Sequence, residues 1–132
     1  MERVFVDTGA WYACFVHAAK GGERVREVLE EYENRLVTSE YVFDELVTLV
    51  RRRADHPSAV KAGEALRECS RVVEVGRSDV RAAWKLFVGQ SDKGYSFTDC
   101  TSFAMMKRMG IDTSVTTDAH FTQAGFIVLP AR

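Results

Sequence analysis

Five short apolar runs alternate along this chain with longer stretches of helical periodicity. Each run is rich in β-branched or aromatic residues, which is typical of buried strands. The runs lie at residues 3–6 (RVFV), 36–38 (LVT), 72–75 (VVEV), 114–116 (SVT) and 126–129 (FIVL). The helical stretches cover residues 9–19, 22–33, 40–54, 57–69, 77–89 and 97–109, with a short turn near 119–123. This alternation predicts the α/β class, with a mainly parallel sheet of about five strands covered by helices on both faces.

The length and charge of the chain narrow the classes of protein to which it can belong. Its 132 residues predict a single domain over residues 1–132. A formal net charge of −1 predicts no broad basic surface, so an RNA or DNA partner would need a local basic patch. No run approaches the roughly 18 apolar residues of a membrane span. The charged start of the sequence, with Asp7 inside the first apolar run, does not match a secretory signal.

Three cysteines, Cys14, Cys69 and Cys100, are spaced too widely for a zinc knuckle or a disulfide framework. We expect each of them to be a small buried hydrophobic residue. Free thiols of this kind fit a reducing compartment, so we expect a cytoplasmic protein.

Two aspartates follow predicted strands directly. Asp7 comes after the first strand and Asp118 comes just after the fourth. Because the carboxyl ends of parallel strands share one edge of a sheet, we expect these two carboxylates to converge there. Taken alone, each aspartate also fits the N-cap of the following helix.

A third acid, Asp99, lies in the stretch SFTDCTSF at residues 96–103. Ser96 and Asp99 have the spacing of a capping box, which satisfies helix N–H groups without any further role. Asp99 is also placed at helical spacing from Phe103 and Met106, on the apolar face. A lone carboxylate is expensive to bury, so either it caps the helix or a positive charge meets it.

A fourth acid is predicted mid-helix in residues 40–54, where Val42, Leu46 and Leu49 form an apolar stripe. Glu45 and Asp44 lie on opposite flanks of this stripe, and the helical pattern favours Glu45 only weakly. A solvated charge at the margin of the stripe is the alternative for either residue.

Converging carboxylates repel one another, and a hard divalent cation removes that repulsion. Carboxylate oxygens favour Mg²⁺ or Mn²⁺, whereas Zn²⁺ prefers His or Cys ligands. His17, His56 and His120 are not spaced as a metal-binding set. We expect His17 and His56 at the surface, while His120, two residues after Asp118, is a candidate neighbour of the site.

Four stretches carry these acids, and they read FVDTGAWYA (5–13), TSEYVFDELVTLVRRR (38–53), YSFTDCTSFAMMKRMGI (95–111) and VTTDAHFTQAGFIVLP (115–130). In order and spacing they resemble the PIN-domain ribonucleases, particularly the VapC-like toxins of prokaryotic toxin–antitoxin modules. The resemblance extends over essentially the whole chain. It implies a three-layer α/β/α sandwich, bound Mg²⁺ or Mn²⁺, cleavage of RNA, a homodimer and inhibition by a small VapB-like antitoxin.

The resemblance also assigns roles to individual residues. It favours Glu45 over Asp44. This sequence departs from the family pattern at His120, where many members have another Asp. Matched to the pattern, the catalytic acids are Asp7, Glu45, Asp99 and Asp118; the metal ligands are Asp7, Asp99 and Asp118; the supporting residues are Thr8, Thr116 and His120, with Phe121 as a packing residue.

The sequence therefore predicts an endoribonuclease that uses Mg²⁺ or Mn²⁺ and leaves a 5′-phosphate and a 3′-hydroxyl. Two alternatives stay open: a non-catalytic PIN scaffold that binds RNA or a protein, and a phosphatase with an aspartyl nucleophile. The phosphatase would need a second acid at position 9, which is Gly9. A basic patch for RNA is expected in residues 51–53 and 107–108, with solvated helix ends as the alternative. Apolar residues left exposed on helices 9–19 and 40–54 are expected to support the homodimer.

Overall fold

The computed structural model describes residues 2–16 and 19–131. Their strands are β1 (Val4–Val6), β2 (Leu36–Ser39), β3 (Arg71–Val73), β4 (Thr113–Val115) and β5 (Ile127–Leu129). Their helices are α1 (Thr8–Phe15), α2 (Gly22–Glu31), α3 (Glu40–Arg53), α4 (His56–Cys69), α5 (Arg77–Gly89), α6 (Phe97–Met109) and α7 (His120–Gln123). Each expected strand and helix is present, with ends that differ mostly by one or two residues. The first helix is shorter than expected because the backbone is already extended at Val16.

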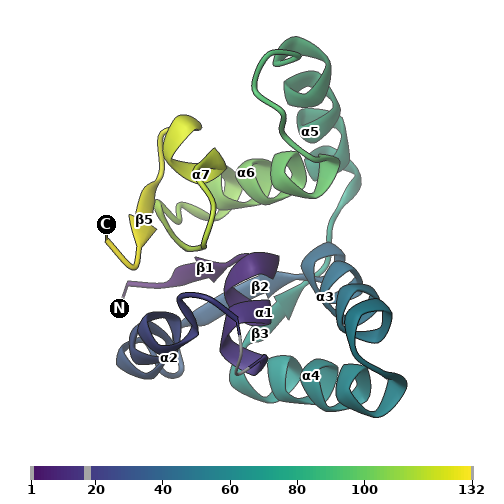
Figure 1. The fold of residues 1–132 in the computed structure, drawn as a ribbon. Helices are drawn as coiled ribbons and strands as arrows, with labels where there is room; N and C mark the ends of the chain where they lie inside the picture. The colour runs from purple at the N-terminus through teal and green to yellow at the C-terminus, as the bar shows by residue number, and fades with distance from the viewer. Residues whose placement is uncertain (1, 17–18, 132) are drawn as a thin grey trace.

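The strands form one parallel sheet in the order β3-β2-β1-β4-β5. Parallel neighbours require crossover connections, and these are right-handed in nearly all proteins. The chain moves outward from β1 to β3 and then returns to β4 on the other side of β1. The direction of travel therefore reverses, and the helices change faces: α1 to α4 lie on one side of the sheet and α5 to α7 on the other (Figure 1). The predicted α/β sandwich with a parallel sheet of five strands is confirmed.

The core forms where the central strands meet the helices. All three residues of β1 are fully buried. Helix α6 has an unbroken buried segment from Asp99 to Met106, which makes it the most enclosed of the described helices. On the other face, the Trp11 indole N–H donates to Thr38 Oγ1 at 3.3 Å, and that hydroxyl donates to the carbonyl of Val6 at 2.8 Å. These contacts hold α1 against the carboxyl end of β1, which Asp7 follows directly.

Two expectations about burial are wrong. Cys100 is buried and Cys14 is half-buried, but Cys69 is exposed because it is the last residue of α4. In the described parts of α1 and α3, no large apolar side chain is exposed, because these helices pack against each other and against their neighbours. The exposed large apolar side chains belong to Val60, Trp84, Phe87, Val88 and Ile127.

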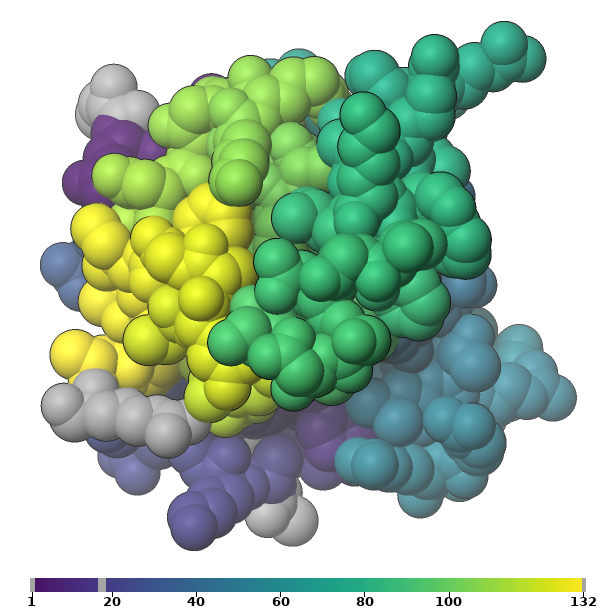
Figure 2. All heavy atoms as spheres, turned by 90° about the horizontal axis from the view of Figure 1, so that it is seen from above, coloured from purple at the N-terminus to yellow at the C-terminus, as the bar shows by residue number. Residues whose placement is uncertain are grey.

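Helix α5 carries three of these exposed residues. The rings of Trp84 and Phe87 stack with centroids 5.8 Å apart, and Phe97 of α6 meets both edge-on. Seen from above, α5 is exposed on the surface beside α6 and the C-terminal segment (Figure 2). We call Trp84, Phe87, Val88 and Phe97 the α5 patch.

The histidine expected at the surface in position 56 is exposed at the start of α4, whereas His17 lies outside the described residues. Among residues 2–16 and 19–131, no helix combines the length and hydropathy needed to cross a membrane.

Candidate metal centre

The site lies where the helices change from one face of the sheet to the other. Ligands of open parallel sheets bind beyond the carboxyl ends of the strands at such a switch point. Here the switch falls between β1 and β4, which pair through Val6 and Val115. Asp7 follows β1 directly, and its backbone N–H donates to the carbonyl of Val115 at 3.0 Å. Asp118 follows β4, so the two aspartates converge at one sheet edge, as the sequence predicts.

A continuous chain of hydrogen bonds links these strand ends. Thr116 Oγ1 donates to Asp7 Oδ2 at 3.0 Å and accepts from the backbone N–H of Asp118 at 3.3 Å. The backbone N–H of His120 then donates to Asp118 Oδ1 at 2.9 Å. Thr116 therefore orients one carboxylate with its hydroxyl proton and the loop of the other with its lone pair.

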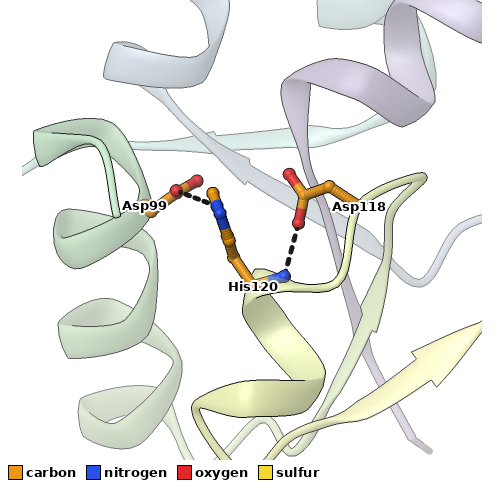
Figure 3. Close-up of side chains that lie close together, drawn as sticks. All are labelled: Asp99, Asp118 and His120. Carbon is orange, nitrogen blue, oxygen red and sulfur yellow. Dashed lines mark hydrogen bonds and ion pairs between the residues drawn. The ribbon is translucent and has the colours of Figure 1, made fainter. Parts of the chain in front are cut away.

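Asp99 caps its helix, which is one of the two alternatives that the sequence left open, and it also faces a second residue of the site. Its backbone N–H donates to Ser96 Oγ at 3.0 Å, and its Oδ2 accepts from the Ser96 backbone N–H at 3.1 Å, which completes the capping box. The same Oδ2 lies 2.8 Å from Nδ1 of His120. The cap holds the carboxylate at the first turn of α6, and the side chain faces the loop after β4 (Figure 3).

Charge and burial make this cluster unfavourable without a cation. Asp7 is only 4% exposed. Burial, and then the nearby charges of Asp118 and Asp99, raise the pKa of Asp7 to about 7, although hydrogen bonds from the Thr8 backbone and Thr116 oppose the shift. Near neutral pH, the protein therefore holds a carboxyl group that ionises only at a cost. A bound divalent cation would remove that cost.

The donor atoms fit such a cation. Among the residues that the structure describes, the ligand atoms of Asp99, Asp118 and His120 all lie within 4.8 Å of one another. Oxygen from two carboxylates and nitrogen from one imidazole are ordinary ligands of divalent metals. Beside Asp7, the hydroxyl of Thr8 is buried without a hydrogen-bond partner, so a polar group at this edge is still unsatisfied.

The four expected acids are not equally placed. Asp7 lies outside the close group, although its charge interacts with those of Asp99 and Asp118. Glu45 and Asp44 are both exposed on α3, which begins directly after β2 at the same edge of the sheet. The structure brings Asp99, Asp118 and His120 together, and Glu45 is not part of this close group.

The contacts of His120 and Tyr95 at the candidate metal centre were not predicted from the sequence. The rings of Tyr95 and His120 meet at nearly a right angle with centroids 5.5 Å apart, and the Tyr95 ring meets that of Phe103 in the same way at 5.0 Å. Tyr95 precedes the capping residue Ser96, and nothing else in its local sequence marks it. The position of His120 near Asp118 indicated proximity to the site, but not its contact with Asp99.

The basic patch expected from the sequence is only partly available. Arg108 binds Asp79 through two hydrogen bonds of 2.7 and 2.9 Å, which tie α6 to α5. Lys107 remains exposed and, with Lys93 and Tyr95, lines a pocket formed by α5, α6, the loop between them and the end of α7. Because Tyr95 also touches His120, this pocket lies next to the acid cluster.

Known proteins share both the sequence and the fold. The sequence profile of the PIN domain matches residues 4–127. The chain is 33% identical over 125 residues to the 23S rRNA-specific endonuclease VapC20 of Mycobacterium tuberculosis, covering 94% of this chain and 95% of that protein. The crystal structure of VapC20, described as a sarcin–ricin loop cleaving toxin, superposes with a TM-score of 0.89 at 31% identity, over 94% of this chain and 96% of the other.

More distant structures share the fold. DNA-bound VapBC from Salmonella typhimurium matches at 14% identity with a TM-score of 0.76, covering 97% of each chain. A toxin–antitoxin complex from Klebsiella pneumoniae matches at 12% identity with a TM-score of 0.72, covering 98% of each chain. With the profile match, the VapC20 identity and the acids gathered at the sheet edge, this chain belongs to the PIN-domain family and, within it, to the VapC-like proteins.

Proposed function

We propose that this chain is a divalent-metal-dependent endoribonuclease and the toxin of a toxin–antitoxin pair, acting as one PIN domain over residues 1–132. The observation that carries the proposal is the convergence of Asp7, Asp99 and Asp118 at the switch point of a PIN-family sheet. PIN nucleases use a divalent metal, and the VapC20 relative, which shares 33% of its sequence with this chain, is an endonuclease specific for 23S rRNA. We infer the same class of substrate here, a structured loop of ribosomal RNA.

Each acid has a role that follows from its surroundings. Asp99 and Asp118 would hold Mg²⁺ or Mn²⁺, and Asp7 would complete the negative charge that attracts the ion, directly or through water. When bound, the ion would lower the pKa of a water molecule and neutralise negative charge on the phosphate. Glu45, which is exposed on α3, would accept a hydrogen bond from the attacking water and orient it for in-line attack on phosphorus.

The remaining side chains position the acids. Thr116 holds Asp7 by its hydroxyl, and Thr8, the next residue after Asp7, has a buried hydroxyl that is still available to donate. Such outer contacts fix the rotamers of metal ligands and are costly to remove. Attack by water rather than by the ribose 2′-hydroxyl would leave a 5′-phosphate and a 3′-hydroxyl.

RNA must reach a protein whose net charge is −1. We propose that Lys93 and Lys107 receive a phosphate of the bound RNA, because both line the pocket that contains Tyr95, whose ring also contacts His120. Arg108 is not assigned to RNA, since Asp79 already occupies its guanidinium group.

We also propose two protein partners. A VapB-like antitoxin would inhibit by placing an Arg side chain on the clustered carboxylates, because a guanidinium group matches carboxylate geometry with two parallel hydrogen bonds. A second copy of this chain would cover the α5 patch, since Trp84 and Val88 are 57% and 60% exposed. With RNA as substrate, we place the protein in the cytoplasm.

The phosphatase alternative is disfavoured because it needs a second acid at position 9, where this chain has Gly9. A side chain at this position would also displace the hydroxyl of Thr117, which would lie 2.5 Å from its Cβ atom. The non-catalytic scaffold is an outcome of the test below.

The test is to express the chain under tight control in bacterial cells and map new 5′ ends across the cellular RNA. We expect growth arrest and a dominant cleavage position in 23S rRNA, both abolished by Asp118→Asn. Asp112→Asn, a matched change at an exposed side chain just before β4, at the opposite end of the strand from Asp118, should behave like the parent. Unchanged 5′ ends, or the same ends with Asp118→Asn, would exclude this activity and favour the non-catalytic scaffold.

A further inference from the structure

His120 gives the candidate metal centre a donor of a different kind from its acids. Its Nδ1 lies 2.8 Å from Asp99 Oδ2, while its own backbone N–H holds Asp118 Oδ1 at 2.9 Å. One residue therefore touches both close acids, and its ring nitrogen belongs to the group of atoms that lie within 4.8 Å of one another. Figure 3 shows the imidazole between the two carboxylates, on the loop that leads into α7.

The spacing of these atoms suits a small octahedral ion. Ligands at about 2.0–2.1 Å from such an ion lie about 2.9 Å apart when adjacent and about 4.2 Å apart when opposite. The distance of 2.8 Å between Nδ1 and Asp99 Oδ2 matches the adjacent spacing. The span of 4.8 Å for the whole group exceeds the opposite spacing by only about half an ångström. Small side-chain movements would therefore bring all three donors onto one ion.

The ring of His120 is also restrained. The edge contact with Tyr95 limits its rotation, and its side chain is 31% exposed. A ligand held in this way loses little conformational entropy on binding, yet the ion can still reach it.

Donor type decides which metal such a site prefers. Mg²⁺ favours oxygen ligands and retains its waters, whereas imidazole nitrogen suits transition metals. A site made of carboxylates alone would discriminate weakly between Mg²⁺ and Mn²⁺. One nitrogen donor shifts the preference toward Mn²⁺ and away from Mg²⁺.

We propose that His120 is a metal ligand through Nδ1 and makes this site select Mn²⁺ over Mg²⁺. The inference deepens the proposed function, because it names the ion and one ligand of the same centre. The competing interpretation is that Nδ1–H only donates a hydrogen bond to Asp99. His120 would then position that acid, and the metal would have oxygen ligands alone.

Spectroscopy of the unmutated protein separates the two interpretations. The Mn²⁺-loaded chain, in a buffer free of coordinating nitrogen, is examined by electron spin echo envelope modulation, which detects ¹⁴N bound directly to Mn²⁺. We expect a ¹⁴N signal in the parent and in His56→Asn, which changes an exposed histidine on α4, and no signal in His120→Asn. A Mn²⁺-loaded parent without a ¹⁴N signal, or a chain that takes up no Mn²⁺, would overturn the proposal.

Calorimetric titration of the same proteins with each metal gives the selectivity. His120→Asn should weaken Mn²⁺ binding by about tenfold or more and change Mg²⁺ binding by less than about threefold. His120→Asp should move the preference toward Mg²⁺. Equal losses for both metals would contradict selection by nitrogen.

Measuring RNA cleavage by the same preparations shows whether a failed test refutes the ligand assignment or the proposed nuclease activity. A chain that binds Mn²⁺ through nitrogen but cleaves no RNA retains the ligand assignment and refutes the nuclease. A chain that cleaves RNA with a Mn²⁺ spectrum lacking nitrogen refutes the ligand assignment alone.

Discussion

Replacing Asp7 by Asn should make the metal-free protein more stable while it abolishes RNA cleavage. The Asn side chain has nearly the same shape, and its carbonyl oxygen can still accept the hydrogen bond from Thr116. What disappears is a negative charge that is buried and repelled by Asp118 and Asp99. A site residue that destabilises its own fold is expected where function requires clustered charge.

The magnitude follows from the pKa of Asp7, which rises from 3.8 to about 7 on folding. A raised pKa of an acid penalises the folded state. The penalty is absent below pH 3.8, grows as the pH rises toward 7 and is complete above 7. At pH 8 it amounts to about 4 kcal/mol, since each unit corresponds to about 1.4 kcal/mol. For a chain of this length, each kcal/mol shifts the thermal midpoint by about 3–4 °C.

The assay is thermal and urea unfolding of the parent and Asp7→Asn in EDTA, from pH 5 to pH 9. The difference between the two proteins should widen as the pH rises toward 8, and Asp112→Asn, at an exposed side chain before β4, should show no such trend. Saturating Mn²⁺ should stabilise the parent more than the variant. A variant that is less stable than the parent at pH 8, or a stability difference between the two proteins that does not change with pH, would refute the argument from buried charge.

Three further predictions concern the ion pair, the surface and the substrate path. Arg108→Ala should cost about 2–3 kcal/mol in urea unfolding at pH 7, because it strands the buried Asp79 carboxylate. The Arg108 guanidinium lowers the pKa of Asp79, so this loss should shrink as the pH falls below 3.8, and a loss that persists in acid would contradict the ion-pair explanation. Trp84→Glu should convert a dimer into a 14.9 kDa monomer in light scattering, whereas Val60→Glu on α4 should leave the dimer intact, and the opposite pattern would move the interface away from α5. Lys107→Ala should raise KM for RNA about three- to tenfold and flatten its salt dependence with little change in kcat, and a kcat effect alone would exclude a phosphate contact.

The sequence predicted the fold and the convergence of three acids because both depend on rules that act over short distances. A residue that follows a parallel strand lies at a fixed edge, so the positions of Asp7 and Asp118 followed from the strands alone. Asp99 followed from its helix start, because a capping box fixes both the backbone and the carboxylate. In each case the neighbouring residues determine where the side chain lies.

What the sequence did not predict depends on packing between distant segments. The contact of His120 with Asp99 requires α7 to sit against α6 at one rotation, which the edge-to-face rings of Phe103 and Phe121 establish. The exposed α5 patch was missed because hydrophobic periodicity shows that a helix has an apolar face without showing whether another element covers it. The structure does not distinguish Glu45 from Asp44 as the fourth acid either, since both side chains are exposed on α3.

The most direct test of the account is the origin of the oxygen and the end groups formed when the chain cleaves RNA. The purified protein is incubated with its RNA target and Mn²⁺ in ¹⁸O-labelled water, and the products are analysed by mass spectrometry. The account predicts that EDTA and Asp99→Asn each abolish cleavage, and that the parent leaves a 5′-phosphate with one ¹⁸O atom beside an unlabelled 3′-hydroxyl. A 2′,3′-cyclic phosphate with a 5′-hydroxyl would show that the ribose rather than water attacks phosphorus, and cleavage that survives EDTA would show that no divalent metal is needed. Either result would contradict the account.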